Sequence, residues 1–330
     1  MFGLGGGKPR YCVKFGAHAV AWGERSRNWR GRYSYRCVVL PIPAGAAKLS
    51  PIEPNISDHA ALEEHLRTLA GPGKSLRLAG RVLIPQLPRA VTLLIPDLAV
   101  RMTVLSLDQL PSQKPELEAL IRWRLGQEQQ FPQAGTKLAW QVFPPAHGEK
   151  EPMIVLVAAI QHSILTQYES LCESVGLLPQ GVHVSSADVF NLWFRVAGGY
   201  RRFARDLACL TVLDGALTCI VFHRGRPIFV RTKLLGIESG GSTDDGAAAD
   251  RILDETAASL LACRERHPGV DVKEIVLMAE IGGRRVEDLL ANELGATVDR
   301  LAWDHVRALG WKPGGGTTSA AALPVVAAMV

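Results

Sequence analysis

Residues 91–143 contain the stretch that decides the fold. It comprises VTLLIPDLAV (91–100), RMTVLSLDQLP (101–111), ELEALIRWRLGQEQQFP (116–132) and KLAWQVF (137–143). The first run predicts a buried strand that ends at Pro96-Asp97, and the alternating residues after it predict a second strand up to Leu107. Apolar residues then recur with the spacing of a one-faced helix, at Leu117, Leu120, Ile121 and Leu125. This segment therefore predicts a small unit in which a helix covers a sheet.

The rest of the chain reads as two halves, each of which begins with paired strands and continues with alternating strands and helices. The first half is expected to contain strands at 11–22, 33–41 and 77–85. Between the last two we expect a helix that is capped by Ser57 or Asp58 and closed by Gly71. A Gly/Arg-rich joint, GGYRRFARD at 198–206, separates the halves. The final run, AAALPVVAAMV at 320–330, predicts a buried element that is too short to cross a bilayer.

The order of these segments resembles the type IV pilus assembly protein family PilM, whose members are actin-like relatives of the division protein FtsA. PilM carries a block similar to PdsaV…lp…E…E…fP…ldf.v. The matching residues in this chain are Pro96, Asp97, Val100, Leu110, Pro111, Glu116, Glu118, Glu128, Phe131 and Pro132. A further matching segment runs from Val155 to Leu192, and the resemblance covers nearly the whole chain.

The resemblance implies an α/β chain with a two-lobed actin-like fold, built from ribonuclease H-like repeats and carrying an FtsA/PilM-type inserted subdomain. We expect the first lobe at 1–195, including the inserted subdomain at about 91–150, and the second lobe at 196–330. In this fold class a nucleotide is normally held between the lobes.

The two phosphate loops of actin-like ATPases have only partial equivalents here. The first loop resembles IDIGs.s.K in the family, and the equivalent VKFGAHAVAW keeps Gly16 but has Lys14 where the family has Asp. A lysine contacts phosphate but does not coordinate Mg²⁺. The second loop resembles vDIGa.sT.l…g…f.R, and an alignment on Thr218 puts Val212 at the Asp and Asp214 at the Gly. A slip by one residue instead makes Asp214-Gly215 a shortened loop, and the sequence leaves both alignments open.

Two glycine pairs are similar to other nucleotide-binding motifs of the family. Gly282-Gly283 follows an apolar strand, where the adenosine-side motif is expected, and Gly240-Gly241 precedes a helix. An ordinary tight turn explains such pairs equally well. The family resemblance implies a pseudo-ATPase, with no bound cofactor or with ATP or ADP held weakly, and no catalytic residue is assigned.

Composition and motifs argue against an ordinary metabolic or metal enzyme. The chain has 330 residues, of which 47% are hydrophobic and 21% charged, as in soluble globular proteins. It contains no GxSxG, GxxxxGK[ST] or HExxH motif. Six cysteines are scattered without a CxxC pair, which predicts buried thiols and no metal site. With no signal peptide and no bilayer-spanning run, we expect a cytosolic protein.

The formal net charge is +5, and the basic excess is concentrated near the N-terminus. Arginines alternate there with aromatic residues, at Arg25, Arg27, Arg30, Arg32 and Arg36 and at Trp22, Trp29, Tyr33 and Tyr35. The pattern fits a hairpin that turns at 28–31 with a solvated basic face. Contact with anionic lipid or with a protein partner is a second interpretation, and nucleic-acid binding is a third, which we do not adopt.

The family resemblance implies a cytoplasmic scaffold, peripheral to the inner membrane through its partners. PilM-like proteins hold an N-terminal peptide of the inner-membrane protein PilN against the inserted subdomain, so we expect a groove between this subdomain and the first lobe, with contacts at Pro96, Asp97 and Arg101. The resemblance also implies contacts with other platform proteins and self-association. The alternatives are a soluble component similar to the type II secretion L protein and an active actin-like ATPase or kinase.

Overall fold

The computed structural model describes residues 9–27, 29, 31, 33–71, 76–78, 81–84, 88–128, 134–145, 151–196, 205–236, 245–309, 312–316 and 319–330. Contacts divide the chain into two compact units, and neither of them is contiguous in sequence. One unit contains 1–97, 165–197 and 301–330, and the other contains 98–164 and 198–300. The predicted lobes are contiguous instead, and their boundary between residues 195 and 196 stays a prediction.

A six-stranded sheet forms the centre of the first unit. Its strands, in spatial order, are β10 (Leu177–Val184), β6 (Arg89–Ile95), β1 (Tyr11–Phe15), β2 (Ala19–Arg27), β3 (Tyr33–Pro41) and β16 (Lys312–Gly316). β1, β2 and β3 are antiparallel neighbours, whereas β6 and β10 run parallel to β1. The strand predicted at 11–22 is therefore wrong, because the chain reverses after Phe15. The N–H of Gly16 donates to the carbonyl of Ala19 (2.9 Å) and closes this turn.

Helices of the first unit flank this sheet, namely α1 (His59–Ala70), α3 (His162–Ser174), α4 (Ser185–Val196), α8 (Trp303–Ala308) and α9 (Leu323–Met329), which a short η2 (Ala320–Ala322) precedes. The predicted burial of the final run is confirmed, since α9 packs on β1 and β2. The approach is close at Gly23, where a Cβ atom would lie 2.9 Å from Cε of Met329. Gly23 thus lets the helix reach the sheet.

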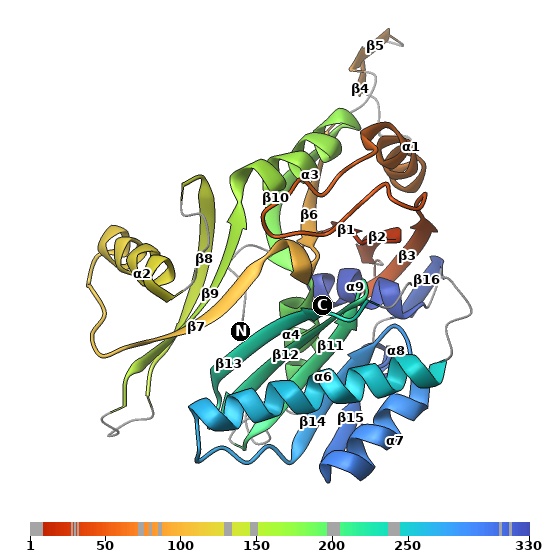
Figure 1. Cartoon of the computed structure of the whole chain (residues 1–330). Helices are drawn as coiled ribbons and strands as arrows, with labels where there is room; N and C mark the ends of the chain where they lie inside the picture. The colour runs from red at the N-terminus through yellow and green to blue at the C-terminus, as the bar shows by residue number, and fades with distance from the viewer. Residues whose placement is uncertain are drawn as a thin grey trace. The chain divides into compact units, whose positions relative to one another are not determined.

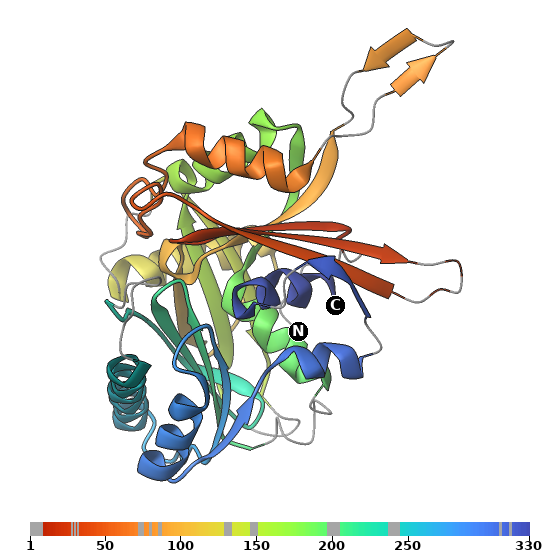
Figure 2. The same ribbon diagram turned by 90° about the vertical axis from the view of Figure 1, so that its right-hand side faces the viewer.

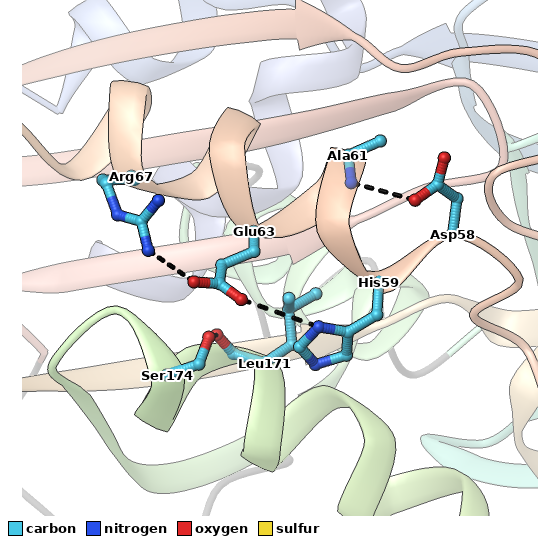
Figure 3. A network of polar contacts seen from close by, with 7 residues as sticks. All are labelled: Asp58, His59, Ala61, Glu63, Arg67, Leu171 and Ser174. Atoms are coloured by element: carbon cyan, nitrogen blue, oxygen red, sulfur yellow. Dashed lines mark hydrogen bonds and ion pairs between the residues drawn. The ribbon is translucent and has the colours of Figure 1, made fainter.

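Of the two predicted caps of α1, the structure uses Asp58, whose Oδ1 accepts a hydrogen bond from the N–H of Ala61 (3.0 Å). Figure 3 shows this cap and, along the same helix, the contacts of Glu63 with His59 and Arg67. The helix ends at Gly71, as expected. The predicted strand at 77–85 is instead a short hairpin, β4 (Leu76–Leu78) and β5 (Arg81–Ile84).

The second unit contains a five-stranded sheet with the same pattern. Its strands, in spatial order, are β13 (Arg226–Leu234), β12 (Ala216–His223), β11 (Leu207–Leu213), β14 (Glu274–Ala279) and β15 (Thr297–Arg300). Again the first three strands in sequence are antiparallel and the last two are parallel to the first. Figure 1 shows α6 (Asp245–Arg266) and α7 (Gly283–Leu294) beside this sheet. Five strands of the first sheet and the five strands of the second follow the same order, with β16 as the additional strand of the first, which confirms the predicted similarity of the two halves.

The inserted subdomain lies in the second unit and forms a three-stranded sheet, β7-β9-β8, with one helix. Its elements are η1 (Asp97–Ala99), β7 (Arg101–Leu107), α2 (Lys114–Glu128), β8 (Thr136–Phe143) and β9 (Met153–Gln161). The predicted helix face is confirmed, because Leu117, Ile121 and Leu125 pack against strand residues such as Val155. The subdomain sheet runs from Arg101 to Gln161, so it starts and ends later than the expected range of about 91–150. Val91 belongs instead to β6 of the first sheet.

Two further sequence predictions concern the whole chain. All six cysteines are free and buried, as predicted. None of the helices in the described ranges has the length and hydrophobicity needed to cross a bilayer.

Candidate functional site

Asp214 and Gly215 form the two-residue turn between β11 and β12. Their φ angles are +54° and +73°. Two consecutive positive φ values are typical of a type I′ hairpin, for which Asp-Gly is a favoured pair. The register supports this geometry, because Leu213 pairs directly with Ala216. The turn is therefore as short as a hairpin allows, which is the geometry of the alternative that makes Asp214-Gly215 a shortened loop.

Glu280 connects this turn to the neighbouring parallel strand. It directly follows β14, and its own N–H donates to the carbonyl of Val212 (3.1 Å). Its Oε2 accepts a hydrogen bond from the N–H of Asp214 (3.1 Å). Sequence reasoning missed Glu280, although its place after a buried parallel strand is a recognisable signal, since ligands gather at the carboxyl ends of such strands.

Gly282 and Gly283 start α7 at the same edge of the second sheet. Gly282 has φ +79° and is the N-cap residue, and Gly283 has φ +49°. A Cβ atom on Gly282 would lie 2.3 Å from Cγ2 of Val286, whereas one on Gly283 would meet nothing within 4 Å. Because Val212 pairs with Ala279, the structure brings four predicted residues, Asp214, Gly215, Gly282 and Gly283, to one edge. Gly240-Gly241 lies outside the described residues.

A threonine row crosses the same sheet close to this edge. Thr211 pairs with Thr218 in the register of β11 and β12, and Thr218 pairs with Thr232 of β13. The Oγ1 atoms of Thr218 and Thr232 are 3.1 Å apart. Thr211 and Thr218 are both only 1% exposed, so the aligned threonine of the second loop is part of a buried sheet face.

Lys14 and Gly16 belong to the other packing unit. Lys14 lies within β1, between Ala21 of β2 and Leu94 of β6, and is 3% exposed. A buried ammonium group is costly unless neighbouring groups compensate it, and Lys14 does have an interaction partner within the structure. Gly16 sits in the tight turn after the strand. Val212, the residue aligned with the second family Asp, is buried at 1% exposure.

Pro96 and Asp97, which we predicted as partner contacts, are both buried. Oδ1 of Asp97 accepts a hydrogen bond from the N–H of Ser186 (3.1 Å), in the first turn of α4. The hydroxyl of Ser185 donates to the carbonyl of Ile95 (3.1 Å). Asp97 therefore satisfies an N–H group at the start of a helix, where a carboxylate is favourable.

Arg101, the third predicted contact, is exposed at the first position of β7. β7 and β8 are the two edge strands of the subdomain sheet, and β13 of the same unit packs against β7. On β8, Lys137 and Ala139 are exposed, while α2 covers one face of the sheet. Of the three predicted contacts, Arg101 is the one with an exposed side chain.

No family model matches the chain, and no curated protein matches it. A chain of the PilM–PilN type IV pilus biogenesis complex has a TM-score of 0.69 and 18% sequence identity, over 98% of this chain and 100% of that chain. The cytoplasmic domain of EpsL, an inner-membrane component of the Vibrio cholerae type II secretion system, gives a TM-score of 0.46, 9% identity and coverages of 96% and 94%. A protein of unknown function with an actin-like ATPase fold from Bacteroides thetaiotaomicron gives a TM-score of 0.46 and 11% identity, over 92% of this chain and 96% of that chain. The predicted resemblance is thus confirmed at the level of the fold, which this chain shares over nearly its whole length with a chain of the PilM–PilN complex.

Proposed function

We propose that this protein is an actin-like scaffold of a type IV pilus or related assembly platform. In this proposal it binds the N-terminal peptide of a PilN-like inner-membrane protein and has negligible ATPase activity. The observation that carries the proposal is the fold shared along the whole chain with a member of a PilM–PilN complex. Such a scaffold resides in the cytoplasm and reaches the inner membrane through its partner.

The proposed peptide site is on the inserted subdomain, at the start of β7 around Arg101. An extended peptide gains affinity from backbone hydrogen bonds along a strand and from pockets for alternate side chains. Arg101 is an exposed cation at the start of β7, and its guanidinium N–H groups are suited to donate hydrogen bonds to backbone carbonyls or to a carboxylate of the peptide. Pro96 and Asp97 are buried, and Asp97 holds the start of α4, so the proposed contact with the peptide rests on Arg101.

The proposed loss of hydrolysis is supported by the residues at both loop positions. Lys14 and Val212 stand where the resemblance places the aspartates that organise Mg²⁺ and water, and both are buried. At the second loop, Asp214 lies in a tight turn whose N–H donates to Glu280. The Glu280 carboxylate therefore places a negative charge beside this turn. If the turn is the equivalent of the family's second phosphate loop, that charge opposes the binding of a phosphate group. Weak nucleotide binding without turnover remains compatible with the scaffold.

The proposal is tested by a binding titration with a synthetic peptide. The peptide is the N-terminal segment of the PilN-like membrane protein that a neighbouring gene encodes. We expect saturable binding to the wild type, and about tenfold weaker binding to Arg101→Ala, because a charge-assisted hydrogen bond contributes about 1.5 kcal/mol. Lys137→Ala is the matched control, since it removes an exposed cation from the opposite edge strand. Absence of binding to the wild type, or equal losses in both variants, would overturn the proposal.

A further inference from the structure

The far end of the β2–β3 hairpin extends beyond the neighbouring strands of its sheet. β1 pairs with β2 as far as Glu24, one further hydrogen bond runs from the N–H of Arg25 to the carbonyl of Arg10 (2.8 Å), and β16 pairs with β3 only as far as Ser34. Beyond these points β2 and β3 pair with each other, and Arg27 pairs with Tyr33. Figure 2 shows the end of this hairpin projecting to the right, away from α9. We call Arg25, Arg27, Trp29 and Tyr33 the hairpin tip.

The arginines of the hairpin tip are held in place by an aromatic ring. The guanidinium carbons of Arg25 and Arg27 lie 5.3 and 5.4 Å from the centre of the Tyr33 ring, within the range of cation–π attraction. Nε of Arg27 also donates to the carbonyl of Gly31 (3.2 Å). Within the described part of the chain, these are the contacts of Arg27, and neither involves a carboxylate. The nearest acidic residue along the strand, Glu24, is instead paired with Arg10 (3.7 Å).

Trp29 is the most exposed large apolar residue of the described chain. Its exposed fraction is 86%, compared with 2% for Trp22 and 1% for Trp193. A tryptophan in that position adds nothing to a hydrophobic core. Indole rings are enriched at the headgroup level of membranes, where the ring is partly apolar and its N–H remains hydrated.

We propose that the hairpin tip binds the surface of an anionic phospholipid membrane directly. In this arrangement Trp29 enters the headgroup region, and Arg25 and Arg27 contact lipid phosphates. Arginine suits this role because its guanidinium group donates two parallel hydrogen bonds to phosphate oxygens. The contact is independent of any partner peptide, and the net charge of +5 favours approach to an anionic leaflet.

A membrane fits the hairpin tip better than a nucleic acid does. Single-stranded nucleic acids stack successive bases on several aromatic side chains along a basic groove. Here the Tyr33 ring already makes cation–π contacts with Arg25 and Arg27. Trp29 is therefore the one exposed aromatic ring among the described tip residues. A single exposed indole beside clustered arginines is the arrangement expected at a lipid interface.

Co-sedimentation of the full chain with vesicles tests this inference. We expect the wild type to pellet with phosphatidylcholine vesicles that contain phosphatidylglycerol, but not with phosphatidylcholine alone. Arg27→Glu should weaken the partition coefficient at least about fivefold, because each arginine near an anionic surface contributes about that factor. Trp29→Ala should also weaken it, and added salt should release the wild type, since exposed charges are screened beyond about 8 Å at physiological ionic strength.

Two control variants separate the hairpin tip from general surface effects. Arg264→Glu makes the same change of charge at an exposed position of α6, and Trp123→Ala removes an indole that is 55% exposed on α2. Both should bind vesicles like the wild type. Failure of the wild type to pellet, equal losses in tip and control variants, or tip-dependent binding to single-stranded RNA but not to vesicles would overturn the inference.

Discussion

The backbone N–H of Asp214 donates a hydrogen bond to Oε2 of Glu280 over 3.1 Å. This bond joins the turn after β11 to the loop after β14, and the N–H of Glu280 in turn donates to the carbonyl of Val212. The carboxylate at this edge of the sheet therefore stabilises the protein's own backbone.

Replacement of Glu280 should loosen the turn at Asp214. Glu280→Ala leaves the Asp214 amide without its acceptor, so we expect its hydrogen exchange to become about tenfold faster, as for the loss of about 1.4 kcal/mol. Glu280→Gln keeps an acceptor oxygen and should show a smaller increase. Unchanged exchange in the alanine variant would mean that the bond does not hold the turn in solution.

The two glycines at the start of α7 should differ sharply in their tolerance of alanine. Both have positive φ, which costs an alanine about 1 kcal/mol. At Gly282 the new Cβ would also meet the buried and stiff Val286 side chain, so we expect Gly282→Ala to cost about 3 kcal/mol and Gly283→Ala about 1 kcal/mol. Denaturant unfolding of both variants measures this difference. Equal costs would show that Val286 moves away freely.

The pair of His183 and Asp188 should make stability depend on pH. Nδ1 of His183 lies 2.9 Å from Oδ2 of the buried Asp188. Burial opposes charge on the imidazole, but the hydrogen bond and the attraction of Asp188 outweigh it and raise the pKa of His183 above its usual value. Burial has the largest effect on Asp188 and raises the pKa of its carboxyl, although His183, Arg195 and Asn191 favour the ionised form.

Because the folded pKa of His183 is the higher one, its stabilisation is complete below about pH 6.5 and is lost as the pH rises through the folded value. Between pH ~6 and pH ~8 the wild type should therefore lose more unfolding free energy than His183→Gln. Chemical denaturation at the two pH values provides the measurement. The idea fails if the variant shows the same loss.

Purified protein should release no phosphate from Mg²⁺-ATP above a protein-free blank. The physical reason is that Lys14 and Val212, at the positions expected for metal-organising aspartates, offer no carboxylate to Mg²⁺. Steady-state phosphate release checks this expectation, with Asp214→Asn as a comparison. Turnover in the wild type that disappears in this variant would show that Asp214 is a working catalytic residue.

The sequence predicted correctly those elements whose pattern of apolar residues lies within a single short segment of the chain. The face of α2 is an example, because Leu117, Ile121 and Leu125 are 8%, 0% and 4% exposed. The strand predicted at 11–22 was wrong because apolar residues continue on both sides of the reversal. Gly16 is the single turn signal there, and one glycine inside an apolar run also fits a continuous strand.

Contacts between distant segments account for what the sequence did not indicate. Asp97 holds the N–H of Ser186, which lies 89 positions further along the chain, and no periodicity reports such a bond. The link from Glu280 to Asp214 spans 66 positions. In contrast, Asp214-Gly215 was recognisable as a turn because the Asp-Gly pair itself favours two positive φ angles.

The most direct test of the scaffold account is hydrogen exchange of the full chain with and without the N-terminal peptide of the neighbouring PilN-like protein. The account predicts new protection in β7, around Arg101, because an extended peptide that binds there forms backbone hydrogen bonds and excludes water. Exchange at Asp214, Gly215, Gly282 and Gly283 should stay unchanged. Protection at those four residues, with none in β7, would contradict the account.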